Sequence, residues 1–119
     1  MLAQAFLPRR ENPYGSGPEK YLSVDWLEYF NGNLRQQLDQ VRNVLLQNRG
    51  RTVGRRSVFA IVNVGLTKQI GVKNNRKLLV KTTGNPHDPS HSGVYGLTPD
   101  DITIAQDIAS SARVEDAWS

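Results

Sequence analysis

The chain has 119 residues, of which 38% are hydrophobic, a formal net charge of +4 and no cysteine. This length predicts one domain with a modest core, and the lack of cysteine excludes disulfides and thiolate chemistry and fits a reducing cytoplasm. No stretch approaches the roughly 18 apolar residues that a membrane helix needs, and no basic residue precedes the short apolar start, as it would in a signal peptide. We therefore expect a cytoplasmic protein with no membrane contact.

The charge is unevenly distributed along the chain. No acidic residue lies between Asp39 and Asp88, whereas the last twenty positions hold five acidic residues and one basic residue. We expect a dipolar molecule with a basic surface in its middle part. The basic residues of this part are Arg42, Arg49, Arg51, Arg55, Arg56, Lys68, Lys73, Arg76, Lys77 and Lys81.

The first third of the chain predicts a loop, a strand and a helix. Proline and glycine recur through residues 8–20, which indicates a flexible loop. Apolar and polar residues then alternate over residues 21–26, which is typical of a half-buried strand. Apolar residues at helical spacing predict a helix over 34–47, capped by Asn33 and ended by Gly50.

The stretch Ser57–Val64 is apolar on both alternating faces and rich in β-branched residues, so it predicts a central strand. With the preceding strand and helix it could form a right-handed, parallel βαβ unit. Residues 65–75 are polar and basic and are expected to connect it to a strand over 77–83. A connection this short favours antiparallel pairing of those two strands.

The last third predicts a long loop over residues 84–97, with a short strand at 93–95, and a helix that starts at Thr98 and Pro99. Residues 114–119 are expected to fray unless Trp118 docks. The expected fold is α+β: a single domain over 1–119 with a mixed sheet of three or four strands, one crossover helix and a C-terminal helix.

The segment from His87 to Gly93 gathers both histidines of the protein with an aspartate and two serines. His91 with His87 or Asp88 could supply the general acid and base of a metal-independent enzyme acting on a nucleotide or nucleic acid. The alternative is a polar turn with local hydrogen bonds. Two histidines without further ligands do not complete a metal site, so we expect neither a metal nor a cofactor.

The basic middle could bind nucleic acid or another polyanion, with Arg55 and Arg56 as the candidate residues. Single-strand binding recruits stacking aromatic side chains, and residues 40–87 contain only Phe59, which is expected in the core. The alternative is a basic surface that aids solubility. Asn63 and Gly65, at the end of the central strand, could contact a ligand or simply end the strand.

The segment 26–30 holds Trp26, Tyr29 and Phe30. Such a group of aromatic residues could contact a partner, but it more often belongs to the core, which is what we expect here.

Two blocks carry a resemblance. The sequences LSVDWLEYF, at 22–30, and DPSHSGVYG, at 88–96, resemble segments of small uncharacterised bacterial proteins with LSVNWLEYF-like and DPSHSGI-like blocks. Those proteins typically have asparagine where this chain has Asp25. The resemblance implies no activity and marks these two blocks for mutagenesis.

The leading interpretation is a small bacterial accessory or binding protein that contacts a protein partner or a ligand. If the two blocks lie near each other, they form one contact surface. The candidate binding residues are Asp25, Trp26, Glu28, Ser90, Arg55 and Arg56.

Overall fold

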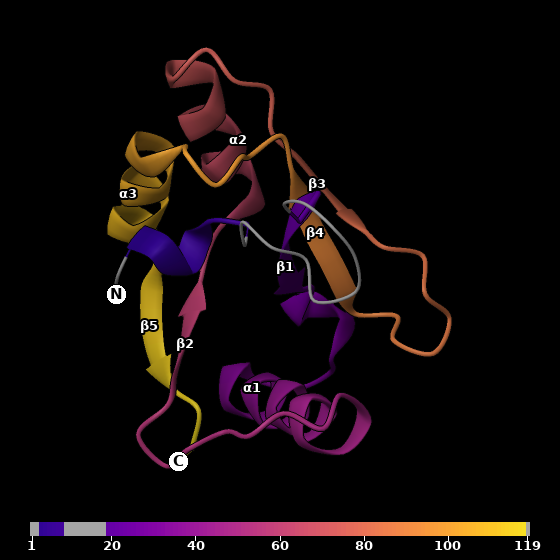
Figure 1. The fold of residues 1–119 in the computed structure, drawn as a ribbon. Helices are drawn as coiled ribbons and strands as arrows, with labels where there is room; N and C mark the ends of the chain where they lie inside the picture. The colour runs from indigo at the N-terminus through magenta and orange to yellow at the C-terminus, as the bar shows by residue number, and fades with distance from the viewer. Residues whose placement is uncertain (1–2, 9–18, 119) are drawn as a thin grey trace.

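The computed structural model describes residues 3–8 and 19–118. They form an α+β domain with two separate antiparallel sheets, which confirms the expected class, but no mixed sheet (Figure 1). The loop expected over 8–20 lies largely outside the described residues. The elements in chain order are η1 (Ala3–Phe6), β1 (Tyr21–Asp25), η2 (Leu27–Tyr29), α1 (Leu34–Asn43), η3 (Val44–Asn48), β2 (Val58–Ile61), α2 (Val64–Lys73), β3 (Leu79–Thr82), β4 (His91–Tyr95), α3 (Ile102–Ser111) and β5 (Arg113–Asp116).

The larger sheet has the order β1-β4-β3, with β4 in the centre. Ser92 and Val94 of β4 are buried on its inner face, and Gly93, between them, is buried on the outer face. Only a short strand was predicted here, within a long loop, because serine and glycine have low strand propensity. Pairing with two neighbouring strands outweighs that propensity.

The smaller sheet pairs β2 with β5. The prediction of a fully covered central strand at 57–64 is therefore wrong: β2 has one partner in the part of the chain that the structure describes, and Val58 is 43% exposed. The parallel βαβ unit and the pairing of 57–64 with 77–83 are wrong as well, because the 21–26 and 77–83 strands both join β4. Sequence periodicity predicts strands but does not identify their partners.

Helix α2 replaces the polar connection that was expected after β2. Asn63 caps it, since its Oδ1 accepts a hydrogen bond from the Leu66 amide at 2.9 Å. The sequence disfavoured a helix because it contains Gly65 and Gly71, which have low helix propensity. Gly71 is required by packing, however: a Cβ there would lie 2.7 Å from Cγ of Leu78.

Helix α1 confirms the predicted helix and its cap. The Asn33 side chain accepts from the Gln36 amide at 2.9 Å, and the Gln36 side chain accepts from the Asn33 amide at 2.8 Å. The helix buries Leu38 and Val41 and continues into the π-helical turn η3. It therefore reaches Arg49, which begins the basic connection to β2.

The core lies between the inner face of the larger sheet and the helices α2 and α3, which are drawn to the left of that sheet in Figure 1. Helix α3 begins at Ile102, later than the predicted start at Thr98, because residues 98–101 form a turn in which Asp101 accepts from the Thr98 amide at 2.6 Å. Ile102, the first residue of the helix, is exposed. The buried residues of this core are Phe6, Ile70, Leu78, Val94, Leu97, Ile104, Ala105 and Ile108.

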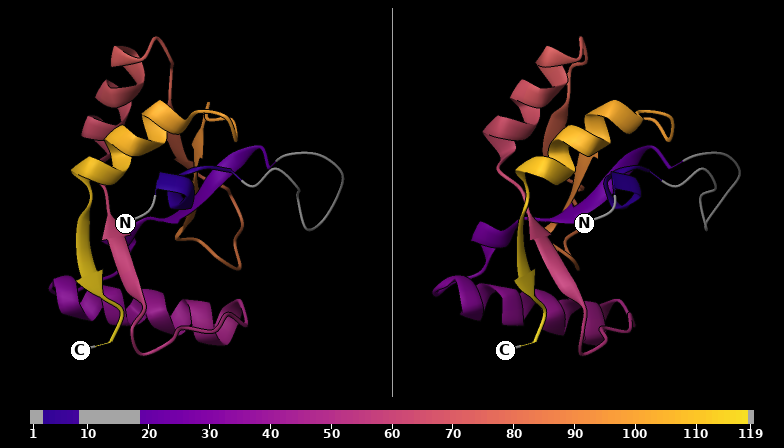
Figure 2. Two further views of the ribbon diagram at one scale, coloured as in Figure 1. Left: turned by 60° about the vertical axis from the view of Figure 1, so that its left-hand side comes forward. Right: turned by 90° about the vertical axis from the view of Figure 1, so that its left-hand side faces the viewer.

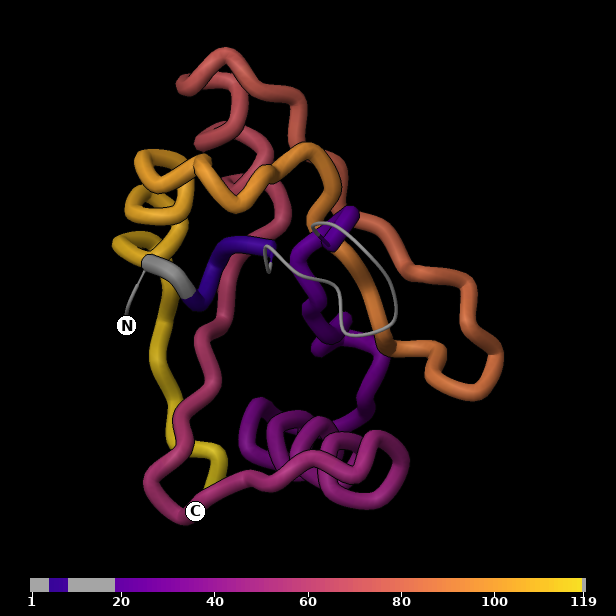
Figure 3. The backbone as a smooth tube through the Cα atoms, in the orientation of Figure 1, coloured from indigo at the N-terminus to yellow at the C-terminus, as the bar shows by residue number. Residues whose placement is uncertain are grey.

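Fraying was predicted for residues 114–119 unless Trp118 docks; residues 113–116 form β5 and Trp118 docks, whereas Ser119 lies outside the described residues. The indole Nε1 of Trp118 donates to the Val53 carbonyl at 3.1 Å, and the guanidinium of Arg42 lies 4.2 Å from the centre of its ring. Arg35 donates to the Asp116 carbonyl at 2.8 Å. Figures 2 and 3 show the result: α1 lies across the end of the smaller sheet, and the chain between α1 and β2 passes beside the segment that follows β5.

Candidate functional site

The end of β1 lies beside the start of β4. Asp25 is directly opposite His91 in the strand register, and the Trp26 amide donates to the Ser90 carbonyl at 2.8 Å. The blocks 22–30 and 88–96 therefore meet at one end of the larger sheet. This is the juxtaposition that a shared site requires.

Arg49 joins the two blocks. It follows the π-helical turn at the end of α1, and its guanidinium donates to both carboxylates. The distances to Asp25 are 2.6 Å from Nη2 and 3.0 Å from Nη1, and those to Asp88 are 2.7 Å from Nε and 2.8 Å from Nη2. Each carboxylate receives two bonds, which is the strongest geometry available to arginine. We call Asp25, Arg49 and Asp88, with Ser90, the Arg49 network.

The hydrogen bonds of the network shift the pKa values of Arg49 and Asp88. The hydrogen bonds that Arg49 donates to Asp88 and, to a smaller extent, to Asp25 raise the pKa of Arg49 far above its usual value, against the opposing effect of burial. The Arg49 guanidinium in turn holds the pKa of Asp88 below its usual range. One cation and two anions leave a net negative charge, so the network does not attract another anion.

Two hydroxyl side chains complete the surroundings. The buried Ser90 donates from Oγ to Oδ1 of Asp25 at 3.2 Å. His91 lies within 3.0 Å of the Thr83 hydroxyl through Nδ1. The Asp88 and His91 amides both close turns, through the Asn85 and Asp88 carbonyls, respectively. The 84–90 loop is therefore fixed to the sheet by main-chain and side-chain bonds.

The structure brings together only some of the predicted site residues. Asp25, Asp88 and Ser90 share the Arg49 network, and His91 lies next to it. His87 and Glu28 are exposed. Arg55 and Arg56 lie in an exposed turn before β2 and form no ion pair among the described residues. Sequence reasoning did not single out Arg49, whose only local signal is its place at the end of a helix, within the basic stretch.

An exposed aromatic pair follows Asp25 directly. Trp26 is 48% exposed and Tyr29 is 45% exposed, so the expectation that both lie in the core is wrong, whereas Phe30 is buried as expected. The rings of Trp26 and Tyr29 are 6.0 Å apart, centre to centre, and Tyr29 packs edge-on against Phe30 at 5.3 Å. We call Trp26 and Tyr29 the aromatic pair.

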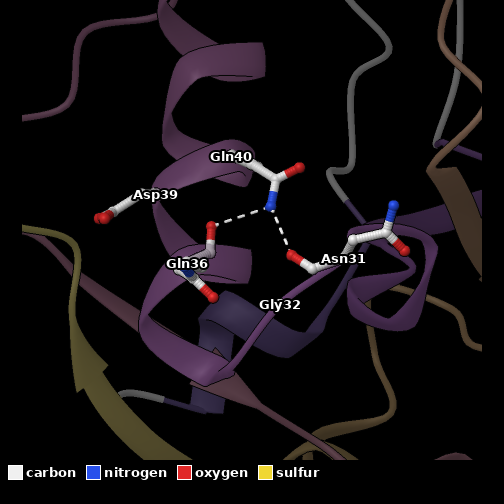
Figure 4. Close-up of a pocket in the computed structure, with 5 residues that line it drawn as sticks. All are labelled: Asn31, Gly32, Gln36, Asp39 and Gln40. Carbon is white, nitrogen blue, oxygen red and sulfur yellow. Dashed lines mark hydrogen bonds between the residues drawn. The ribbon is translucent and has the colours of Figure 1, made fainter.

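Three other places on the surface were compared with the Arg49 network as candidate binding sites: Asn63 and two hollows. Asn63 is occupied as the cap of α2, which favours its structural interpretation. A shallow hollow of about 440 Å³ at the start of α1 is lined by three amide side chains, Gly32 and Asp39, and in it Gln40 donates to the Asn31 and Gln36 carbonyls (Figure 4). A second hollow, of about 500 Å³, lies between α2 and β3. Neither of these two hollows includes the Arg49 network.

Within residues 3–8 and 19–118, no helix has the length and apolar character needed to span a membrane. The same residues contain no group of three or more histidine and carboxylate side chains placed to hold a metal ion. No protein-family model, curated protein or solved structure matches this chain. The resemblance of the two blocks to small bacterial proteins therefore stays a prediction.

Proposed function

We propose that this chain is a small bacterial accessory protein that binds a protein partner through the aromatic pair and the polar residues beside it. The observation that carries the proposal is the exposure of Trp26 and Tyr29, side by side, on one short turn. Tryptophan and tyrosine are the residue types that most often dominate the energy of protein interfaces. Glu28, exposed on the same turn, would belong to the polar rim of such an interface.

The turn that carries the aromatic pair is held at both ends. At one end, the Trp26 amide donates to the carbonyl of Ser90, a member of the Arg49 network. At the other end, the buried Phe30 anchors the turn, and its carbonyl accepts from the Gln37 side chain of α1 at 3.0 Å. A surface that is rigid before binding loses less conformational entropy when a partner docks.

An enzyme has less support than a binding protein. The carboxylate of Asp88, a candidate catalytic group, is doubly bonded to Arg49 and is held in its charged form. His87, the other candidate partner of His91, is exposed, and among the described residues its ring forms no hydrogen bond that would orient it. A general base needs a lone pair that is free to reach a substrate proton.

The test starts with affinity capture from the source cells and then uses the purified partner. Trp26→Ala is expected to weaken binding by about 30-fold, equivalent to about 2 kcal/mol at a hot spot. Val72→Ser, at another exposed apolar side chain, on α2, is the matched control and should change affinity less than twofold. Equal affinity of the wild type and both variants would exclude the aromatic pair as the contact surface.

A further inference from the structure

The outer face of the β1-β4-β3 sheet carries a row of rings. Tyr21 and Tyr95 are opposite each other in the strand register, with their ring centres 5.0 Å apart, and Tyr21 contacts His91 edge-on at 6.1 Å. All three side chains come from alternate positions of β1 or β4, so they lie on the same face. The inner positions of the same strands hold Leu22, Val24 and Val94 of the core.

Gly93 allows two of these rings to lie flat against the sheet. A Cβ at this position would be 2.7 Å from Cδ2 of Tyr21 and 2.9 Å from Cε2 of Tyr95. Any other residue would therefore push the rings away from the strand. Packing aromatic rings over a strand glycine also stabilises the strand pairing, so this arrangement is built into the sheet.

Positive charge lies beside the rings. The Lys81 ammonium, on β3, is 4.6 Å from the centre of the Tyr95 ring, and Lys81 is exposed. Lys81 forms no ion pair with any carboxylate of the described residues. Asp25 is the one acidic side chain that β1, β4 and β3 place on this face, and it is doubly bonded to Arg49.

The face is open to solvent. Leu79, next to Tyr95 in the register, is 42% exposed, and Ser23, opposite Gly93, is exposed as well. The three rings are partly exposed. An open sheet face with aromatic rings and a lysine has the features with which small sheet domains bind single-stranded nucleic acid: bases stack on the rings and phosphates contact the lysine.

We propose that the outer face of the β1-β4-β3 sheet, centred on Tyr21, Tyr95 and Lys81, binds single-stranded nucleic acid. This function goes beyond the protein contact of the aromatic pair and uses different side chains. It also answers the objection that the basic middle of the sequence lacks aromatic residues. The fold brings tyrosines from β1 and β4 to a lysine of that basic segment.

Fluorescence anisotropy with labelled oligouridine, oligothymidine and a DNA duplex tests the proposal. We expect both single strands to bind more tightly than the duplex. Tyr95→Leu should weaken binding by about tenfold, as expected for the loss of one stacked base, whereas Tyr95→Phe keeps the ring and should change affinity less than twofold. A duplex that binds as well as the single strands would overturn the proposal, as would the absence of binding.

Lys81→Gln and Lys68→Gln form a charge-matched pair, since both remove one exposed lysine but Lys68 lies on α2. Lys81→Gln should reduce the slope of log affinity against log salt by about 0.7, the value for one phosphate contact to a single strand, and Lys68→Gln should leave it unchanged. Equal effects of the two variants would show attraction by net charge only and overturn the proposal. If Tyr95→Leu fails to fold, the comparison of Lys81→Gln with Lys68→Gln still tests whether the sheet face binds the single strand.

Discussion

The larger sheet buries one face in the core beneath α2 and α3, whereas the smaller sheet leaves Val58 and Val114 exposed and is tied to α1 by polar contacts. Those contacts are hydrogen bonds from Arg35 and Arg42 to main-chain carbonyls at the end of β5. The two sheets of one small domain thus depend on different interactions. Apolar burial stabilises the first. The second packs Ala60 against the same core, and charge-assisted hydrogen bonds position it against α1.

The largest effect is expected in the core. Ile108 is 2% exposed, so Ile108→Ala should lower the free energy of unfolding by about 2–5 kcal/mol, through lost burial and the cavity left behind. Urea denaturation followed by circular dichroism measures this change. Ile102→Ala, on the exposed side of the same helix, is the control and should cost about 0.5 kcal/mol or less. Equal losses would show that α3 is not packed as described.

The next largest effect is expected where α1 meets the smaller sheet. Arg42→Ala removes the 2.7 Å bond to the Ala117 carbonyl, the ion pair with Asp39 and the contact with Trp118. We expect the free energy of unfolding to fall by about 1.5–3 kcal/mol, the range for hydrogen bonds to charged groups.

Amide hydrogen exchange shows which strands are destabilised in Arg42→Ala. Amides of β2 and β5 should exchange faster in Arg42→Ala, while those of β4 should keep most of their protection. Arg55→Ala, in the exposed turn before β2, is the control and should leave both sheets unchanged. Uniformly faster exchange in Arg42→Ala would contradict the separation of the two sheets.

A smaller effect is expected at the start of α1. Asn33→Ala removes one half of the capping box and should lower the free energy of unfolding by about 1 kcal/mol. Denaturant unfolding measures it, and Asn33→Ser should recover most of the loss because serine is also a good cap. A cost below the error of the measurement would show that the tertiary contacts of α1 hold the helix without its cap.

The last prediction concerns the pH dependence of stability, which involves Asp88. Its pKa is lowered by Arg49. Because the pKa is lower in the folded state than the unfolded value of about 3.9, the stabilisation is fully present well above that value and is lost as the pH falls through the folded pKa. The melting temperature should therefore fall in acid, and less steeply in Asp88→Asn than in the wild type. Identical profiles below about pH 4 would contradict the ion pair.

Local patterns in the sequence predicted the elements whose signals are local. The alternation over 21–26 and the periodicity after Asn33 correspond to β1 and α1. By contrast, β4 contains serine and glycine, and β5 reads Arg-Val-Glu-Asp, so neither resembles a typical strand. Their strand form comes from pairing with distant segments. Predicting them requires knowledge of which segments meet.

The same limit applies to the candidate site. The hypothesis of a shared site required that Asp25 and the 88–91 segment lie close together, and the structure pairs Asp25 with His91. Arg49 was not selected, because its partners are 24 and 39 positions away in the sequence. Trp26 and Tyr29 were assigned to the core by their residue type. Only the fold shows that the turn after β1 presents them to solvent.

The central claim is that the Arg49 network holds the aromatic pair in the position that a protein partner recognises. The most direct measurement is the affinity of the captured partner for Arg49→Gln, a variant that keeps every exposed residue of the proposed surface. Nuclear magnetic resonance spectra would first establish that the variant is folded. We predict a loss of affinity of at least about tenfold, or about 1.4 kcal/mol, with Trp26 unchanged in the sequence. Unaltered affinity in a folded Arg49→Gln protein would contradict the claim.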